Sequence, residues 1–297
     1  MSPLLTLRKM LERRLDDGTR SWFQETSKEV ADRDDVRHFA TFFSMASRHA
    51  RDRVPLAPSA EEREAAGRVV EGWNPERWTM LEALRVALLL SRTDLAEDSC
   101  VDAVEELFAY ADEGEQRALY RSLALLPEPE RFAWRAGEGC RTNMSSVFQA
   151  VVLDTSYPAR HFDDVAFRQA VIKSVFVGVP LWRLWGLDGR LDAELARMAL
   201  DLVAERRSAH RPVQPDLWSC LGEHGGDRAL EALEEELQPG NPHTLGRRAA
   251  AYALARAGET SRLRAALATE SDPAVRASME DALSGNTSQS VYSFLEV

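Results

Sequence analysis

The sequence predicts an all-α protein, a helical array or α-solenoid with HEAT-like helix pairs toward its C-terminus. Apolar residues recur at intervals of three and four along most of the chain, as they do at Leu191, Leu195 and Met198. Proline, glycine and capping residues interrupt this pattern again and again. No run of alternating apolar and polar residues bounded by turns predicts a strand. These three observations together favour helices throughout.

Residues 1–135 form the first region, a series of amphipathic helices. Residues 1–18 carry a charge every few positions, which predicts a helix and not an export signal. Ser59 and Glu62 form a capping-box pattern that opens a helix closing near Gly72. Further helices are expected to begin at Asn74–Pro75 and to cover 101–111, 116–126 and 128–136, the last one ending before Gly137 and Gly139.

Residues 136–223 form the second region, in which charge is rare. Thr142 or Asn143 can cap a helix that runs to about Leu153. Asp163 or Asp164 can begin a buried helix that reaches Gly178, and Pro180 ends it. A turn over 186–189 then precedes the helix of the Leu191, Leu195, Met198 stripe.

The C-terminal third resembles a repeat. Arg247 and Leu254 are echoed by Arg276 and Leu283, and 272–276 has the turn-then-helix pattern of HEAT-like repeats. Because one such helix pair cannot bury its apolar face alone, neighbouring pairs must stack over residues 224–284. Residues 285–297 are Ser-rich and are expected to be a flexible tail, although their apolar residues could dock. We expect the four regions to form one continuous helical domain.

Composition restricts the partners and the compartment. The chain has 297 residues, and its 48 acidic and 37 basic residues give a net charge of −11. This charge argues against a general affinity for nucleic acid or anionic membranes. The longest apolar stretch, 175–182, contains Gly178 and Pro180 and is too short to span a bilayer. The three cysteines match no zinc or redox spacing, which favours reduced thiols in a cytoplasmic protein.

No catalytic constellation can be recognised. The six histidines show no HExxH or other paired metal spacing, and GxSxG, P-loop, GxGxxG and CxxC motifs are missing. We therefore name no catalytic residue, no metal ligand and no cofactor. The sequence leaves enzyme activity open and favours a role without it.

Lys173 is the most conspicuous residue of the second region. It is one of only three lysines, against 34 arginines, and it falls within an apolar helical stretch. A lysine in an apolar environment needs a partner, and no acid lies within one turn of it on the same helix. One interpretation is a structural ion pair with a carboxylate from another segment, or a side chain that reaches the surface. The other is a ligand-binding or Schiff-base lysine in a pocket.

Two further segments could complete a polar pocket around Lys173. Arg141 and Asn143 precede an uncharged helix, and a guanidinium at a helix start is a natural seat for phosphate or carboxylate. Asp188 and Arg190 add an acid and a guanidinium in a tight turn, where Asp188 could instead cap the next helix. The candidate ligand-binding residues are therefore Arg141, Asn143, Lys173, Asp188 and Arg190.

The run from Glu138 to Trp218 resembles the EboA-domain family. The matching elements, in family order, are Arg141-Thr142-Asn143, Tyr157-Pro158, Gln169 with Lys173, Gly186-Leu187-Asp188 with Arg190, Leu195-Ala196-Arg197-Met198, Glu205-Arg206, and Arg211 before Leu217-Trp218. The chain departs from the family pattern where Thr155-Ser156-Tyr157-Pro158 replaces an Asn-Pro-Tyr-Pro element. It also departs where Arg168 and Leu191 stand in place of asparagines.

The resemblance implies a role in trafficking secondary-metabolite precursors, and no catalytic activity is established for the family. It also implies protein partners from the same gene clusters: a UbiA-like prenyltransferase, a TatD-like hydrolase and a sugar-isomerase-like barrel. Two hypotheses follow. The chain is a non-catalytic helical scaffold or carrier in such a pathway, or it is an enzyme or small-anion-binding protein that uses a Lys173-centred pocket.

Overall fold

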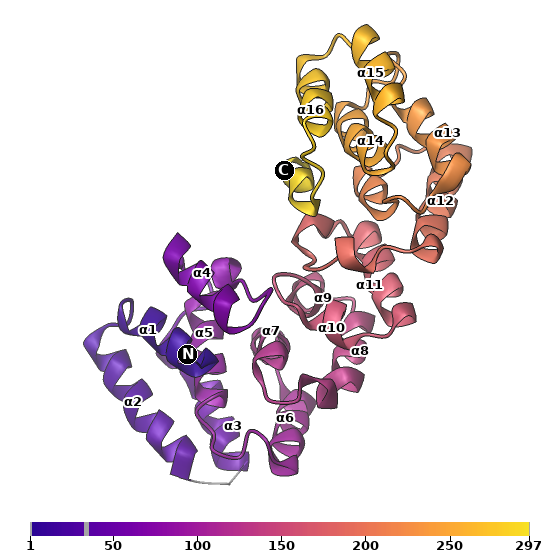
Figure 1. Ribbon diagram of the computed structural model, residues 1–297. Coiled ribbons are helices and arrows are strands. Elements are labelled where there is room, and N and C mark those ends of the chain that lie inside the picture. The colour runs from indigo at the N-terminus through magenta and orange to yellow at the C-terminus, as the bar shows by residue number, and fades with distance from the viewer. Residues whose placement is uncertain (1, 33–35, 297) are drawn as a thin grey trace. The chain divides into compact units, whose positions relative to one another are not determined.

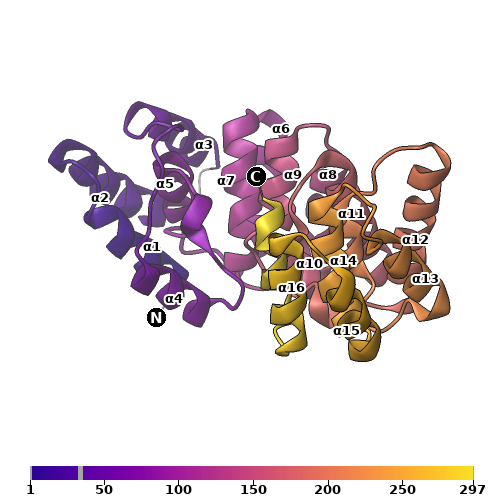
Figure 2. The ribbon, with the colours of Figure 1, turned by 90° about the horizontal axis from the view of Figure 1, so that it is seen from above.

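Helices make up the secondary structure of the computed structural model, which describes residues 2–32 and 36–296 (Figures 1 and 2). Within these residues no strand forms, and one isolated backbone bridge joins Pro55 to Thr79. The all-α prediction is therefore confirmed. The chain divides into two units, Met1–Asp163 and Asp164–Val297, so that the predicted region 136–223 is shared between them.

Unit 1 contains ten α-helices and four short 3₁₀ turns among its described residues. Ser59 and Glu62 form the predicted capping box at the start of α4. The elements are α1 (Pro3–Glu12), α2 (Asp17–Asp32), α3 (Val36–Met45), η1 (Ala46–Arg48), α4 (Ala60–Val69), η2 (Pro75–Arg77), α5 (Met80–Leu89), α6 (Asp98–Tyr110), α7 (Glu113–Ser122), η3 (Leu123–Leu125), η4 (Pro129–Phe132), α8 (Ala133–Arg141), α9 (Ser145–Val152) and α10 (Tyr157–His161).

The core of unit 1 is built around α5, every residue of which is buried. The helix packs against α1, α2, α3 and α7. Its two charged side chains are neutralised inside the core: Glu82 accepts hydrogen bonds from Arg117 (3.0 Å) and Arg121 (3.1 Å). Arg85 donates to Glu115 at 3.2 Å. Buried charges persist only when they are paired in this way.

Gly139 corrects the predicted end of a helix before Gly137 and Gly139. Helix α8 runs through both glycines, from Ala133 to Arg141. A Cβ at position 139 would lie 2.6 Å from the ring of Tyr120 and 2.7 Å from a methyl group of Val151. This glycine therefore lets α8 approach α7 and α9 closely, and tertiary packing outweighs its low helix propensity.

Unit 2 contains six α-helices and four 3₁₀ turns among its described residues. Helix α11 begins at Asp164, as predicted. Leu191 of the predicted stripe lies before α12, and the buried face of that helix follows Leu195, Ala199 and Val203 in place of Met198. The elements are α11 (Asp164–Val177), η5 (Leu181–Arg183), η6 (Asp188–Arg190), α12 (Ala193–Ser208), η7 (Pro215–Cys220), α13 (Gly226–Glu236), α14 (Thr244–Arg256), α15 (Thr260–Thr269), α16 (Pro273–Leu283) and η8 (Gln289–Leu295).

The core of unit 2 is built around α14, which packs against α13, α15, α16 and η7 (Figure 2). Five of its 13 residues are alanines, which allow close approach on several sides. Asp272 caps α16 by accepting from the backbone N–H groups of Ala274 and Val275, as the turn-then-helix pattern predicts. Consecutive helix pairs thus stack here, while their classification as HEAT-like stays a prediction.

The segment after α16 is docked on unit 2 and not loose, which corrects the expected flexible tail (Figure 1). Its short turn η8 buries Tyr292 to 1% exposure. The side-chain amide of Gln289 donates to the carbonyl groups of Leu181, Trp182 and Leu184 at 2.6–3.0 Å. The apolar residues that the sequence showed in this segment, together with one amide, supply the contacts that hold it.

Candidate functional site

Lys173 lies on α11, which is buried on one side and is not the fully buried helix that the sequence predicted. The buried side chains of this helix are Phe167, Ala170, Val171, Ser174 and Val175. Lys173 itself is half-buried, and Phe176 is 61% exposed. The apolar side chains of α11 itself are spread over all sides of the helix. Its sequence therefore does not reveal which face packs against the rest of unit 2.

Arg141 and Asn143 do not stand at a helix start. Arg141 is in the last turn of α8, where it forms an exposed ion pair with Glu138. Asn143 is exposed in the link between α8 and α9, and Met144 occupies the cap position of α9 without a side-chain hydrogen bond. The Thr142 hydroxyl accepts from the backbone N–H of Met144 and so belongs to the turn. The cap of α9 is therefore Met144 and not the predicted Thr142 or Asn143, and Arg141 belongs to the preceding helix.

Arg190 and Asp188 are neighbours in sequence but engage different partners. Arg190 donates to Asp164 at 2.9 Å, and its guanidinium lies 4.6 Å from the ring centre of Phe167. The cap of α12 is Asp192, which accepts from the backbone N–H of Leu195 at 2.8 Å. Asp188 is therefore not the cap of α12 that the sequence allowed.

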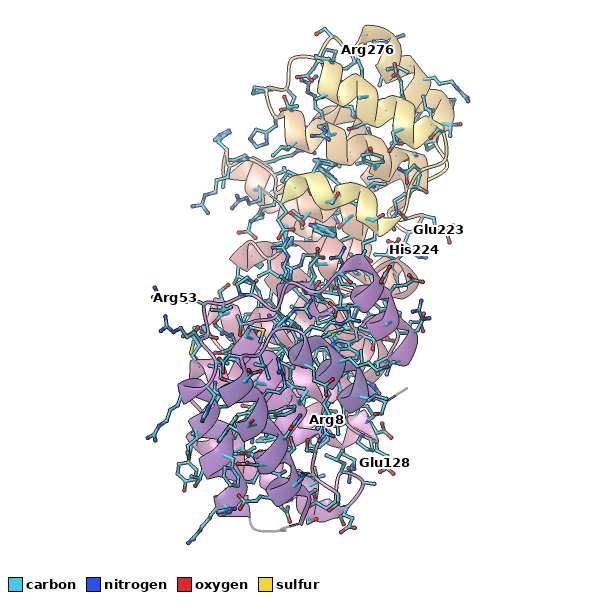
Figure 3. The ribbon with its side chains drawn as sticks, turned by 90° about the vertical axis from the view of Figure 1, so that its left-hand side faces the viewer. Arg8, Arg53, Glu128, Glu223, His224 and Arg276 are labelled. Carbon is cyan, nitrogen blue, oxygen red and sulfur yellow. The ribbon has the colours of Figure 1, made fainter. Side chains whose placement is uncertain are left out.

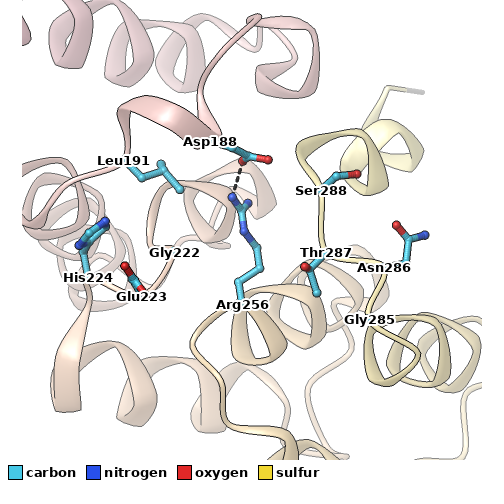
Figure 4. Close-up of a pocket in the computed structure, with 10 residues that line it drawn as sticks. All are labelled: Asp188, Leu191, Gly222, Glu223, His224, Arg256, Gly285, Asn286, Thr287 and Ser288. Carbon is cyan, nitrogen blue, oxygen red and sulfur yellow. Dashed lines mark hydrogen bonds and ion pairs between the residues drawn. The ribbon is translucent and has the colours of Figure 1, made fainter.

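Asp188 lies in a polar pocket of unit 2 with a volume of about 550 Å³ (Figure 4). Lys173 and Arg190 are not among the residues that line it. Four separate stretches of the chain contribute to the wall, from η6, the loop after η7, the end of α14 and the link before η8. The lining residues are Asp188, Leu191, Gly222, Glu223, His224, Arg256, Gly285, Asn286, Thr287 and Ser288.

An ion pair between Asp188 and Arg256 forms the centre of this polar pocket. The other carboxylate oxygen of Asp188 accepts from the backbone N–H of Gln289 at 2.8 Å, which ties the pair to η8. Burial lowers the pKa of the Arg256 guanidinium, but Tyr292 and Asp188 outweigh this effect and the pKa is raised. The guanidinium therefore stays cationic, and the pair is a fixed, mutually neutralised feature.

Tyr292 packs beneath the same guanidinium. The Arg256 guanidinium carbon lies 5.9 Å from the centre of the Tyr292 ring. The phenolic hydroxyl is buried and has no hydrogen-bond partner that meets normal geometry among the described residues. Burial raises the pKa of Tyr292, so the phenol is neutral at physiological pH.

The side chains of Glu223, His224 and Thr287 are uncommitted. None of the three makes a side-chain hydrogen bond or ion pair with another described residue. Glu223 and His224 are exposed and lie together at the edge of unit 2 (Figure 3). These groups are available to a bound molecule, whereas Asp188 and Arg256 are already satisfied by each other.

Sequence reasoning found one residue of this polar pocket, Asp188, and missed the others. Arg256 sits at the end of an alanine-rich helix, and no spacing links it to Asp188. Gly222 and Gly285 have positive φ angles of 51° and 95°, and such glycines are visible in a sequence only as turns. The pocket depends on contacts between distant segments, which leave no local pattern.

Residues 2–32 and 36–296 contain neither a membrane-spanning helix nor a cluster of metal ligands. No helix there is long and apolar enough to cross a membrane. No group of histidine, cysteine, aspartate or glutamate residues there is arranged to hold a metal ion.

The family model described as metabolite traffic protein EboA matches residues 4–222 of the chain. No curated protein and no solved structure matches it. Within the polar pocket, Asp188, Leu191 and Gly222 fall inside the matched range, and the remaining lining residues lie beyond it.

Proposed function

Since the chain belongs to the EboA family of metabolite traffic proteins, we propose that it acts as a non-catalytic carrier of a secondary-metabolite precursor. The carrier binds a small metabolite in the polar pocket of unit 2 and releases it chemically unchanged. The cluster-encoded proteins that the family resemblance implies would supply or receive the metabolite in the cytoplasm. These are the UbiA-like prenyltransferase, the TatD-like hydrolase and the sugar-isomerase-like barrel.

The observation that carries this proposal is the combination of a fixed ion pair and uncommitted polar groups around one cavity. The cavity volume of about 550 Å³ lies in the range of small-molecule sites. The pair of Asp188 with Arg256 gives the pocket a rigid centre, while Glu223, His224 and Thr287 can exchange water for a ligand. Such a site can bind a metabolite non-covalently, with no side chain of the pocket reacting with it.

The chemistry of the nearest potential nucleophiles also favours binding over catalysis. Burial raises the pKa of the Cys220 thiol to about 12, so this residue stays protonated. Tyr292 is likewise held neutral by burial. The lysine that an enzyme hypothesis would use, Lys173, does not line the polar pocket.

The test is native mass spectrometry of the protein after incubation with a metabolite extract, followed by identification of the released compound. We expect a bound small molecule that is recovered with its mass unchanged. Ser288→Trp fills the polar pocket and should abolish the complex. Ser261→Trp, an equally drastic change at an exposed position of α15, should leave it intact.

Two outcomes would overturn the proposal. Recovery of a chemically altered compound would show that the protein is an enzyme. Equal loss of the complex in both tryptophan variants, or no complex in the wild type, would show that the polar pocket is not a carrier site.

A further inference from the structure

The polar pocket also indicates what kind of molecule it holds. We infer that its ligand is a small, hydroxyl-rich molecule of about monosaccharide size that carries no negative charge. This inference rests on the proposed carrier function and goes beyond it by naming the ligand class. It also departs from the small-anion site that the sequence suggested around Lys173.

The charges around the cavity disfavour an anion. Two carboxylates, Asp188 and Glu223, face one guanidinium, that of Arg256. Because Asp188 already neutralises Arg256, the charge of Glu223 is left over. Even a protonated His224 would bring the sum only to zero. A phosphate or carboxylate ligand would therefore meet repulsion, with no free cation to receive it.

The uncommitted atoms of the polar pocket are mainly hydrogen-bond acceptors. Glu223 offers a whole carboxylate, and His224 a ring nitrogen. The amide nitrogen of Asn286 donates to Asp281 at 2.9 Å, which leaves its carbonyl oxygen for a ligand. Hydroxyl groups suit this wall because each one donates to an acceptor and can accept from Thr287 in return.

The placement of these atoms favours a ligand with hydroxyls on more than one edge. Figure 4 shows Glu223 and His224 on one side of Arg256, and Asn286, Thr287 and Ser288 on the other. A molecule seated over the ion pair would face both groups at once. A ring with several hydroxyls can engage both sides, whereas a molecule with a single polar head can engage only one.

An apolar ligand would be a poor fit. Leu191 is the one large apolar side chain among the lining residues, and the two glycines contribute no side chain. A hydrocarbon chain in the cavity would displace water from Glu223 and Asn286 without replacing its hydrogen bonds. Such burial of unsatisfied polar groups is unfavourable.

Calorimetric titration with three sugars of the same ring but different charge tests the inference: glucose, glucosamine and glucose 6-phosphate. We expect glucose and glucosamine to bind, and glucose 6-phosphate to bind at least about tenfold more weakly. Glu223→Gln should weaken glucosamine by about fivefold relative to glucose, the effect of one charge at contact distance in water. Glu231→Gln, an exposed residue of α13 outside the polar pocket, removes the same charge and should leave all three affinities unchanged.

The possible failures separate this inference from the carrier proposal. If glucose 6-phosphate binds most tightly, or if only an anionic or apolar metabolite is found by native mass spectrometry, the ligand class is wrong while the carrier function stands. If Glu231→Gln changes the sugar affinities as strongly as Glu223→Gln, the affinities depend on the overall charge of the protein. The assignment of the ligand to the polar pocket is then wrong. If no metabolite of any class binds, the carrier function itself fails.

Discussion

Two networks, one around α5 in unit 1 and one at the polar pocket of unit 2, use the same pairing of arginine with carboxylate in opposite ways. In unit 1 the charges of α5 are enclosed: Glu82 receives two arginines and Arg85 is satisfied by Glu115 and by the carbonyl of Phe43. In unit 2 the pair of Asp188 and Arg256 borders a cavity, beside Glu223, which has no side-chain partner among the residues that the structure describes. An ion pair alone therefore does not mark a site. Uncommitted polar groups around it do.

The largest expected effect concerns the enclosed network of unit 1. Glu82→Gln keeps the shape of the side chain but leaves Arg117 and Arg121 without their buried carboxylate. We expect a loss of about 3 kcal/mol in the free energy of unfolding, because two largely buried ion pairs are broken at once while Arg117 keeps its pair with Asp52. Urea unfolding measures it. The exposed pair of Glu71 with Arg160 is the control, and Glu71→Gln should cost less than about 1 kcal/mol.

If the two substitutions cost the same, the contrast between an enclosed and an open network is not supported. The glutamine would then satisfy the arginines as well as the carboxylate does.

A smaller effect is expected within α8 of unit 1, where Gly139 serves close packing and Gly137 does not. Gly139→Ala places a methyl group against Tyr120 and Val151 and should cost about 1–3 kcal/mol. Gly137→Ala on the same helix meets no atom within 4 Å and should stabilise the protein by about 0.5–1 kcal/mol. Thermal unfolding compares the two. Stabilisation by both alanines would mean that α8 does not depend on its close approach to α7 and α9.

The smallest effect is expected at the open pair of unit 2. Asp188→Asn removes the charge that holds Arg256 and weakens the acceptor for the Gln289 N–H. We expect a stability loss near 1 kcal/mol, since the carboxylate is partly exposed and the guanidinium keeps Tyr292 and the carbonyl group of Ser219 as neighbours. Carboxypeptidase digestion should release residues 289–296 faster than in the wild type. Glu231→Gln should show the wild-type rate, and an unchanged rate in Asp188→Asn would mean that the pair does not hold η8.

Local patterns predicted the helices of this protein well. The capping box at Ser59 and the start of α11 at Asp164 lie where the sequence indicated, because both depend on residues within one or two turns. Gly139 was misinterpreted as a helix end, since its role depends on Tyr120 and Val151 from other helices. Local sequence sets the helix propensity of each residue. Contacts with residues distant in sequence decide whether the helix forms there.

The site could be predicted only in part for the same reason. Asp188 was recognised because an acid in a glycine-rich turn is conspicuous, but its assigned neighbours, Lys173 and Arg190, do not line the polar pocket. The actual partner, Arg256, is far away in sequence. Apolar composition drew attention to α11, whereas the ligand groups of the polar pocket lie in loops of ordinary polar composition.

The three hydrogen bonds from Gln289 to the carbonyl groups of η5 have a consequence for how unit 2 opens. Linear helical arrays fray from their terminal repeats, because each end contacts one neighbour only. In unit 2 a segment near the beginning, residues 181–184, is clasped by a segment near the end, residues 289–295. Separation of the C-terminal segment from unit 2 must therefore also break its contacts with η5. These contacts couple the two ends of the unit into one cooperative element.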